Sequence, residues 1–468
     1  MTENATGSAA EQLTKTQHDR SALVPAACIR LIYSCVVCSP GGRFQRHFMH
    51  VGVTVRSSDP VGVELSAPLT GLRVVEYGAF VAVPSGAMTL ASLGADVIRI
   101  DPIGGASDTT RAPVDADGSS IYWASLNKGK RSIMLDLRSA EGQEIATAIA
   151  VAPGPDSGLF ITNATGEGWY SEQALRAHRE DLIWVRLIGN ADGQPALDYT
   201  VNWEIGFAAI TGPSDSSAPT MHALPAWDLL AGMHVALSLL TAERHRYRTG
   251  RGESVVLSLA DVALWSTDAL GILSAAQLIG NGRDRTGDFV YGTFGTQFET
   301  ASGPPVLTVA LTKRQWLDLV AVTGIEERVT ALEASTGVLM IDEHARWNHR
   351  EELRSMMAPW FAARTTVQAL DSLRAARIVS GALRTFEETA SGPLVQDNDL
   401  FIPVTHPHLG ALRAMSYPGV FGGQFERPTP IAPELGQHTE AVLADLLGLG
   451  TADIGDLIDR GVAAGPTS

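Results

Sequence analysis

Asp228 is a candidate nucleophile because of the segment that follows it. The run Pro225-Ala226-Trp227-Asp228 leads into apolar residues at helical spacing over residues 227–246, with a Thr-Gly stop at 249–250. This pattern predicts a long helix with Asp228 in or beside its first turn. Free amides and the positive end of the helix dipole favour an ionised carboxylate there. The residues alone leave two roles open: a capping carboxylate, or an ionised group available for chemistry.

Three cations form a cluster in the run Asn127–Ser132. Lys128, Lys130 and Arg131 lie just before a predicted strand. Such a cluster could neutralise the phosphates of a ligand, or could be a solvated basic turn on the surface.

Other polar residues give weaker signals. Asp198 fits turn formation as well as chemistry, and we expect His178, His222, His234 and His245 to be packing or surface residues because they lack metal-ligand spacing. The sequence therefore predicts no metal site. All three cysteines (Cys28, Cys35 and Cys38) precede residue 40, so the rest of the chain cannot use a cysteine nucleophile.

Several common catalytic motifs are missing. The first turn from strand to helix, residues 76–84, lacks the G-x-G-x-x-G that binds a dinucleotide pyrophosphate. The chain also has no G-x-x-x-x-G-K-[ST], G-x-S-x-G or H-E-x-x-H. These absences argue against an ordinary nicotinamide enzyme, a P-loop enzyme and a serine hydrolase.

The elements that must position Asp228 alternate between strands and helices. Short apolar runs alternate with segments of helical periodicity, which predicts a doubly wound, Rossmann-like α/β layer. The predicted strands are 72–77, 95–100, 131–137, 158–162, 182–187 and 254–259, and the predicted helices are 84–94, 142–150, 171–178, 227–246, a segment ending near 279, and 433–449.

The chain of 468 residues, 45% of them hydrophobic, is long enough for two or three domains with a substantial core. We predict a poorly ordered extension over residues 1–65 and a large α/β domain with a linker helix over 66–284. A Gly-rich stretch marks the boundary to a smaller α+β domain over 285–400. The final segment, 401–468, is expected to return to the large domain.

The formal net charge of −16, without a basic stripe, argues against nucleic acid as a partner. No apolar run reaches about 18 residues, so we expect no membrane span. The early apolar stretch, residues 23–38, is interrupted by Pro25 and Arg30 and does not resemble a signal peptide. We therefore expect a cytoplasmic protein.

The order of several segments resembles the class III CoA-transferase family (the CaiB/BaiF type) from about residue 69 to 455. The resemblance rests on Gly71–Glu76, Leu93–Arg99, Asn127–Leu137, the Asp228-x3-Gly232-Met233-His234 pattern, Thr249–Gly252 and Leu435–Thr439. It implies an enzyme that acts on an acyl-CoA substrate, needs no cofactor beyond the CoA of that substrate, and forms an interlocked homodimer.

Carried over by position, the resemblance makes Asp228 the nucleophile. It implies CoA contacts at Phe80, Val81, Leu135, Asp136, Leu137, Arg138 and Asn163, and we add Lys130 and Arg131 for the phosphates. At two positions expected near the nucleotide part of CoA, this sequence departs from the pattern of the family. Glu167 stands where relatives have an arginine, and Ala164 stands where an aromatic residue commonly follows the asparagine.

Some stretches, among them Leu224–Asp228 and Asp198–Asn202, resemble a branch of the family that moves CoA between the two carboxyl groups of one methylfumaryl molecule. One alternative is a transferase with a separate acid acceptor. An α-methylacyl-CoA racemase is less favoured, because Leu197 occupies the position of the racemase histidine. The remaining alternative is an inactive binder of CoA esters.

Overall fold

The computed structural model describes residues 67–466, except Pro155, 281–282 and 422–426, together with two short antiparallel strands, β1 (Cys35–Val37) and β2 (Gln45–His47). Contacts divide the chain into two compact units, Met1–Glu64 and Leu65–Ser468. The rest of the predicted extension over residues 1–65, including Cys28 and Cys38, lies outside the described residues.

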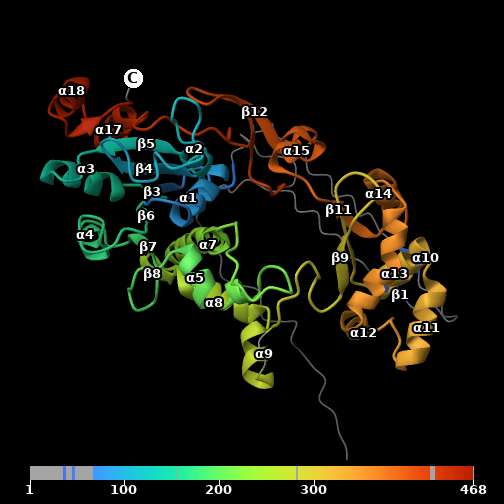
Figure 1. Ribbon diagram of the computed structural model, residues 1–468. Helices are drawn as coiled ribbons and strands as arrows, with labels where there is room; N and C mark the ends of the chain where they lie inside the picture. Colours follow the sequence, from blue (N-terminus) through green and yellow to red (C-terminus); the bar gives the residue numbers. More distant parts are fainter. Residues whose placement is uncertain are drawn as a thin grey trace, which may run out of the picture. The chain divides into compact units, whose positions relative to one another are not determined.

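The second unit contains a seven-stranded sheet (Figure 1). Its spatial order is β14-β5-β4-β3-β6-β7-β8, and all neighbours are parallel except β14, which pairs antiparallel with β5. The strands are β3 (Arg73–Tyr77), β4 (Asp96–Pro102), β5 (Arg131–Leu135), β6 (Leu159–Thr162), β7 (Ile183–Ile188), β8 (Glu253–Ser258) and β14 (Ala463–Ala464). The predicted α/β fold is confirmed, and its order reverses direction between β3 and β6.

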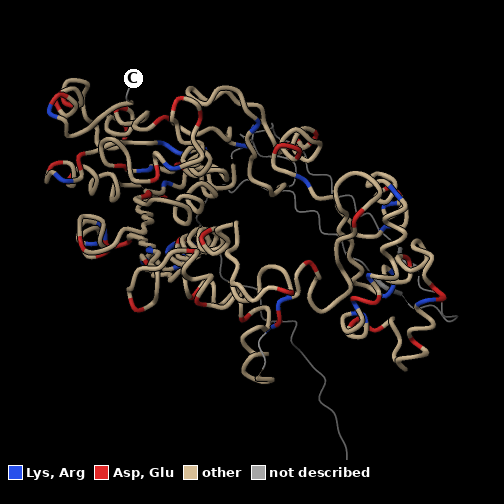
Figure 2. Tube along the Cα trace, in the orientation of Figure 1, with Lys and Arg blue, Asp and Glu red and all other residues tan. Residues whose placement is uncertain are grey.

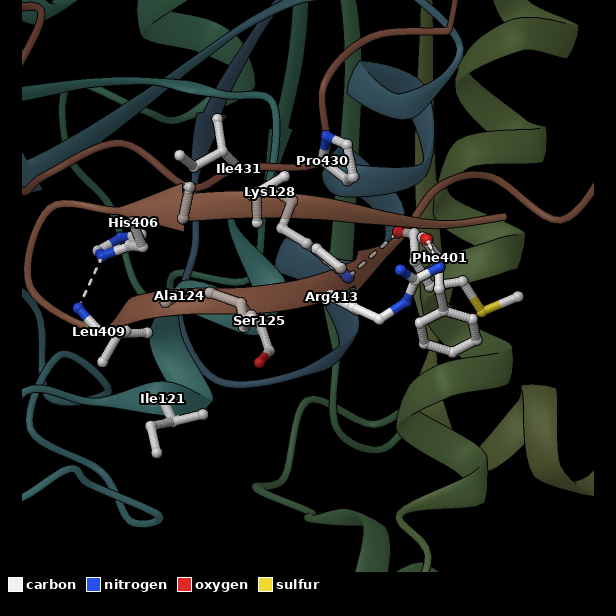
Figure 3. A pocket seen from close by; sticks show the side chains of 15 residues that line it. Ile121, Ala124, Ser125, Lys128, Phe401, His406, Leu409, Arg413, Pro430 and Ile431 are labelled. Atoms are coloured by element: carbon white, nitrogen blue, oxygen red, sulfur yellow. Dashed lines mark hydrogen bonds between the residues drawn. The ribbon is translucent and has the colours of Figure 1, made fainter. Parts of the chain in front are cut away.

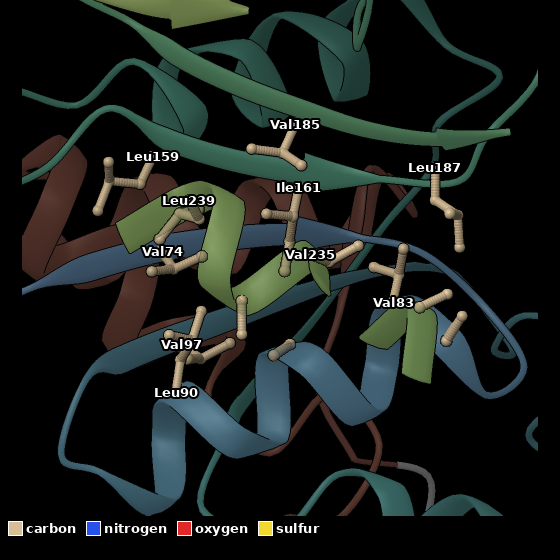
Figure 4. Packing of buried hydrophobic residues seen from close by; sticks show 14 of the residues in the cluster. Val74, Val83, Leu90, Val97, Leu159, Ile161, Val185, Leu187, Val235 and Leu239 are labelled. Carbon is tan, nitrogen blue, oxygen red and sulfur yellow. The ribbon is translucent and has the colours of Figure 1, made fainter. Parts of the chain in front are cut away.

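Helices cover both faces of this sheet. One hydrophobic core lies under α1 (Ala82–Ser92), α7 (Ala226–Thr249) and α8 (Leu259–Ala269), as Figure 4 shows for part of it. The core on the other face lies under α3 (Ala140–Ala150), α4 (Glu172–Arg176), α17 (Thr439–Leu447) and α18 (Thr451–Asp459). Burial on both faces explains why the parallel strands read as continuous apolar runs.

Two predicted helices differ from those observed. The helix expected to end near residue 279 is two helices, α8 and α9 (Ile272–Ile279), with a bend of 67° between them. Gly271 at the break has φ +70°, a conformation that favours glycine. The predicted helix over 433–449 is shorter, because α17 begins only at Thr439.

The remaining elements include a three-stranded antiparallel sheet with its own hydrophobic core. That sheet contains β9 (Phe294–Phe298), β10 (Val306–Ala310) and β11 (Val379–Ala382), packed with α10 (Lys313–Thr323), α11 (Glu326–Thr336), α12 (Glu343–Asn348), α13 (Arg350–Ala362) and α14 (Thr366–Ala375). The other described elements are α2 (Ile121–Leu126), α5 (Asp198–Glu204), α6 (Phe207–Ile210), α15 (Phe386–Ser391), α16 (Pro393–Gln396) and a hairpin of β12 (Phe401–His406) and β13 (Gly410–Met415). The division of the second unit into two domains near residue 285 stays a prediction.

Helices α1 and α7 approach each other closely at two glycines. A Cβ atom built on Gly232 would lie 2.1 Å from Ser85 Oγ and 2.6 Å from the Ala82 carbonyl oxygen, and one built on Gly86 would lie 2.5 Å from the Gly232 carbonyl oxygen. Because Gly232 follows Asp228 by one helical turn, this contact holds Asp228 close to the N-terminus of α1.

Among the described residues, no single helix is both long and apolar enough to span a membrane, and only the bent pair α8 and α9 together meets that length and composition. Lys and Arg side chains lie interspersed with Asp and Glu along the described chain (Figure 2).

Candidate active site

Asp228 is the third residue of α7. A helix between parallel strands runs antiparallel to them, so α1 and α7 both begin at the carboxyl edge of the sheet. Ligands of open α/β sheets bind at this edge, at the point where the strand order reverses. Asp228 is partly buried, and its carboxylate accepts no hydrogen bond from the described residues. A carboxylate that the fold leaves unbonded in this position is available to a substrate.

A different carboxylate caps α7. Asp198, the first residue of α5 and 2% exposed, accepts hydrogen bonds through Oδ2 from the backbone amides of Trp227 (2.7 Å) and Asp228 (3.1 Å). Its Oδ1 lies 2.6 Å from His222 Nε2. Pro225, at the N-cap position, provides no side-chain cap. Asp198 thus replaces the missing local cap and fixes the backbone of the candidate nucleophile.

The surroundings of Asp228 raise its pKa to about 6. Burial is the main cause, the nearby charge of Asp198 adds to it, and Arg111 acts in the opposite direction. The helix N-terminus was expected to favour the ionised form of Asp228, and burial and the charge of Asp198 act in the opposite direction. The capping role considered for Asp228 is wrong, because Asp198 makes the capping bonds.

The turn after β3 faces this helix end. Asn163, directly after β6, accepts a hydrogen bond from the Ala79 amide (3.1 Å) and donates one to the Ala79 carbonyl oxygen (2.9 Å). This bridge spans the gap where the strand order reverses. Phe80 has φ +67°, unusual for a residue with a side chain, and its amide donates to Asp108 Oδ2 at 2.9 Å. Phe80 and Asn163, both predicted CoA contacts, therefore lie at the same edge as Asp228.

Arg111 and Tyr122 complete the surroundings of Asp228. The Arg111 guanidinium lies 5.7 Å from the centre of the Phe80 ring and 5.3 Å from that of Tyr122. Among the described residues it makes no hydrogen bond or ion pair. Burial raises the pKa of Tyr122 to about 12, and the charge of Asp228 contributes to that rise. Tyr122 is thus near both Arg111 and Asp228.

A buried network of charged side chains lies next to the turn after β3 that contains Phe80. Arg99, with its side chain 1% exposed, lies 2.9 Å from Asp101, 3.0 Å from Asp108 and 3.6 Å from Glu76. These carboxylates raise the pKa of Arg99 against the effect of burial. Lys130 Nζ lies 2.7 Å from Glu76. Because Asp108 also holds the Phe80 amide, the network fixes the turn beside Asp228.

The contacts of Lys130 and Arg131 argue against their predicted role at phosphates. Lys130 Nζ is fully buried and also donates to Asn127 Oδ1 (2.7 Å) and the Pro84 carbonyl oxygen (3.0 Å). Arg131 opens β5 and pairs at 2.7 Å with Asp96, which opens β4. Both residues of this pair are at the amino edge of the sheet, opposite Asp228. The fold therefore neutralises both charges. Lys130 lies buried in the network beside the Phe80 turn, whereas Arg131 lies away from the other predicted site residues.

The predicted contacts at the end of β5 are at the carboxyl edge, two strands away from β3. Leu135 is completely buried in the core, so its side chain is not accessible to CoA. Asp136 Oδ1 accepts a hydrogen bond from the Arg138 amide at 3.2 Å, Leu137 is partly buried, and Arg138 is exposed. Val81, the N-cap of α1, is 7% exposed. The CoA contacts of all these residues stay predictions.

A separate cavity of about 190 Å³ lies between α2 and the β12–β13 hairpin (Figure 3). Lys128 and Arg413 line it, and their nitrogens donate to the carbonyl oxygens of Met415 (3.5 Å) and Phe401 (2.6 Å). Burial lowers the pKa of Lys128. Of the three cations in the predicted basic cluster, Lys128 lines this cavity, whereas Lys130 and Arg131 do not. Within the described residues, no group of three or more His, Cys, Asp or Glu side chains could hold a metal ion.

The sequence did not point to Arg111, Tyr122 or Asp108, and it left Asp198 open between turn formation and chemistry. A signal for the buried network existed: Glu76, Arg99 and Asp101 are charges inside apolar strands, where burial requires partners of opposite sign. No pattern connected Arg111 to Asp228, because the loop that brings them together is irregular.

Comparison with known proteins identifies the fold and the family of this chain. A solved structure of a CAIB/BAIF family protein from Brucella suis matches 81% of this chain and 100% of its own with a TM-score of 0.67 and 22% identity, which shows the fold. The 2-methylfumaryl-CoA isomerase of Chloroflexus aurantiacus is 44% identical over 401 residues, covering 85% of this chain and 98% of that protein. The succinyl-CoA–D-citramalate CoA-transferase of the same organism is 28% identical, covering 83% and 96% respectively. Residues 69–439 match the profile of CoA-transferase family III, and the chain belongs to that family.

Proposed function

We propose that this protein is an isomerase that moves CoA from the C1 to the C4 carboxyl group of a methylfumaryl group, converting 2-methylfumaryl-CoA to 3-methylfumaryl-CoA. The single observation that carries the chemistry is the unbonded carboxylate of Asp228, held by its backbone at the carboxyl edge of the sheet. The relative that is 44% identical over nearly its whole length supports the choice of substrate.

The first half of the reaction frees the diacid. An Asp228 carboxylate oxygen attacks the C1 thioester carbonyl, which forms a mixed anhydride and expels CoA as its thiolate. The thiolate then attacks the Asp228 carbonyl carbon of the anhydride. The bond from that carbon to the bridging oxygen breaks, which leaves an aspartyl-CoA thioester and a free diacid with a C1 carboxylate.

The second half reverses these steps at the other end of the diacid. The C4 carboxylate attacks the aspartyl thioester, forms a second anhydride and expels the thiolate. Attack of the thiolate at C4 gives 3-methylfumaryl-CoA and regenerates the Asp228 carboxylate. No oxidation or net proton transfer occurs, so the proposal needs no cofactor besides the CoA of the substrate.

The position of CoA is inferred from the same edge of the sheet. We infer that its thioester end approaches Asp228 beside Phe80 and Asn163, and that the rest of CoA extends toward Asp136 and Arg138 at the end of β5. The exposed Phe80 ring and the partly buried Asn163 support this route. Because CoA thioesters are metabolites of the cell interior, we propose that the enzyme acts in the cytoplasm.

We also propose that the large and small domains of two chains interlock as a homodimer. Helices α7, α8 and α9 leave many apolar side chains exposed, including Leu237 (61%), Trp265 (65%) and Leu278 (87%), and α9 buries none of its residues. An apolar face of this kind is typical of an interface. The molar mass in solution, measured by light scattering, tests this: a monomer would contradict it.

One assay tests the proposed function. The purified protein is incubated with 2-methylfumaryl-CoA alone, and then with isotopically labelled free mesaconate added. We expect 3-methylfumaryl-CoA to form without an added acceptor and to contain no label from the free acid. A strict requirement for an added acid would indicate a transferase with a separate acceptor, and incorporation of solvent deuterium would indicate racemase-type chemistry.

A further inference from the structure

Arg111 is a cation at the active site whose head group the fold does not use. Its backbone is fixed, because its amide donates to the Asp108 carbonyl oxygen (3.2 Å) and its own carbonyl oxygen accepts from Ser120 Oγ (2.6 Å). The side chain is exposed and makes no hydrogen bond or ion pair within the described part of the chain. It lies only against the rings of Phe80 and Tyr122.

The nearby carboxylates do not compensate this charge. Asp108 is occupied by Arg99 and the Phe80 amide, and Asp198 by His222 and the start of α7. Asp228 is the remaining carboxylate whose charge interacts with Arg111, and the proposed reaction consumes that charge when the anhydride forms. The guanidinium is then available to pair with a second anion during turnover.

The substrate supplies such an anion. We propose that Arg111 binds the free carboxylate of the methylfumaryl group and thereby selects diacid monothioesters over thioesters without a second carboxylate. A guanidinium matches a carboxylate through two parallel hydrogen bonds, and the rings of Phe80 and Tyr122 limit its orientations. This inference rests on the proposed function.

One arginine serves both halves of the reaction. At the start it holds the C4 carboxylate while C1 is a thioester. After CoA has moved to Asp228, the released C1 carboxylate takes over the place on Arg111, and C4 is free to attack. The diacid turns end over end without leaving the site, which explains why an external acid is not required.

The test compares two ligands that differ only at this carboxylate. In tiglyl-CoA a methyl group replaces the C4 carboxylate of 2-methylfumaryl-CoA. Dissociation constants are measured by calorimetry in the Asp228→Asn variant, which binds without turnover. With Arg111 present, we expect 2-methylfumaryl-CoA to bind about 10- to 100-fold more tightly than tiglyl-CoA. Arg111→Gln should remove this preference while changing tiglyl-CoA binding less than about threefold, and Arg111→Lys should retain part of it.

Arg251→Gln, which changes an exposed arginine after α7, is the matched control and should keep the full preference. If Arg111→Gln lowers the affinity for both ligands by the same factor, Arg111 is only a packing residue and the inference is wrong. If the variant lowers neither affinity, the inference is also wrong. A wild-type enzyme that fails to isomerise 2-methylfumaryl-CoA while Arg111 still confers the preference would overturn the proposed function but not this inference.

Discussion

Two groups of charges lie next to each other in this protein and differ in how completely they are paired. In the buried network, Arg99 and Lys130 have carboxylate partners within 3.0 Å, and all of these side chains are at most 1% exposed. At the carboxyl edge of the sheet, the side chains of Asp228 and Arg111 make no hydrogen bond or ion pair among the described residues. A charged residue therefore does not by itself identify a ligand-binding site. A charge that the fold neutralises holds the structure, and a charge that it leaves unpaired is available to a ligand.

The largest expected effect is on catalysis. Asp228→Asn should lower isomerase activity by more than about 10⁴-fold, because the nucleophile is lost. The matched control is Asp261→Asn, an exposed aspartate at the same third position of helix α8. It should leave initial rates, measured by separating the two CoA esters, unchanged within about twofold. Comparable losses in both variants would mean that an aspartate at the start of a helix matters only for folding.

The next effect is on stability. Arg99→Met leaves Glu76, Asp101 and Asp108 without their shared cation and should lower the free energy of unfolding by about 3–5 kcal/mol. Arg314→Met removes the exposed pair with Asp318, at 3.4 Å, and should cost less than about 0.5 kcal/mol. Urea unfolding monitored by circular dichroism measures both. Equal losses of unfolding free energy in the two variants would contradict the contrast between the buried network and an exposed ion pair.

A smaller effect concerns the stability cost of Asp228. Its pKa is raised from the usual 3.8 to about 6, so the folded state binds a proton more tightly than the unfolded state. Stability from this group is present below pH 4 and is lost as the pH rises to about 6. Asp228→Asn should therefore stabilise the fold by about 1–3 kcal/mol at pH 7 and by almost nothing at pH 4. If Asp228→Asn raised the free energy of unfolding equally at pH 4 and pH 7, the charge of Asp228 would not be the cause of the gain.

The smallest effect is expected at the amino edge. Arg131 pairs with Asp96 far along the strands from Asp228, so Arg131→Gln should change the KM for the CoA ester less than about threefold and stability by less than about 1 kcal/mol. A tenfold rise in KM would restore the predicted phosphate contact and would require CoA to reach the amino edge.

These contrasts also explain what the sequence could predict. The apolar strand runs predicted the α/β sheet, and the apolar spacing over residues 227–246 predicted the helix that carries Asp228, because burial imposes local residue choices. The pairing of charges was not predictable in this way. Lys130 and Arg131 look like a surface cluster in sequence, yet their partners Glu76 and Asp96 come from strands more than 30 residues earlier. The rise in the pKa of Asp228 comes first from its burial and then from Asp198, which is 30 residues away, and both depend on the tertiary structure.

The role of Asp228 as the nucleophile can be tested directly by measuring the transfer of ¹⁸O from the substrate to this residue. In the proposed sequence, attack by the C4 carboxylate on the aspartyl thioester leaves one of its oxygens on Asp228 when the second anhydride is cleaved. 2-Methylfumaryl-CoA labelled with ¹⁸O in both C4 carboxylate oxygens is mixed with excess enzyme for a single turnover, and the peptide that contains Asp228 is analysed by mass spectrometry. With Asp228 as the nucleophile, we expect Asp228 to gain one ¹⁸O atom while the C4 thioester of the product keeps the other. Complete conversion to the C4 ester with no label on Asp228 would contradict it.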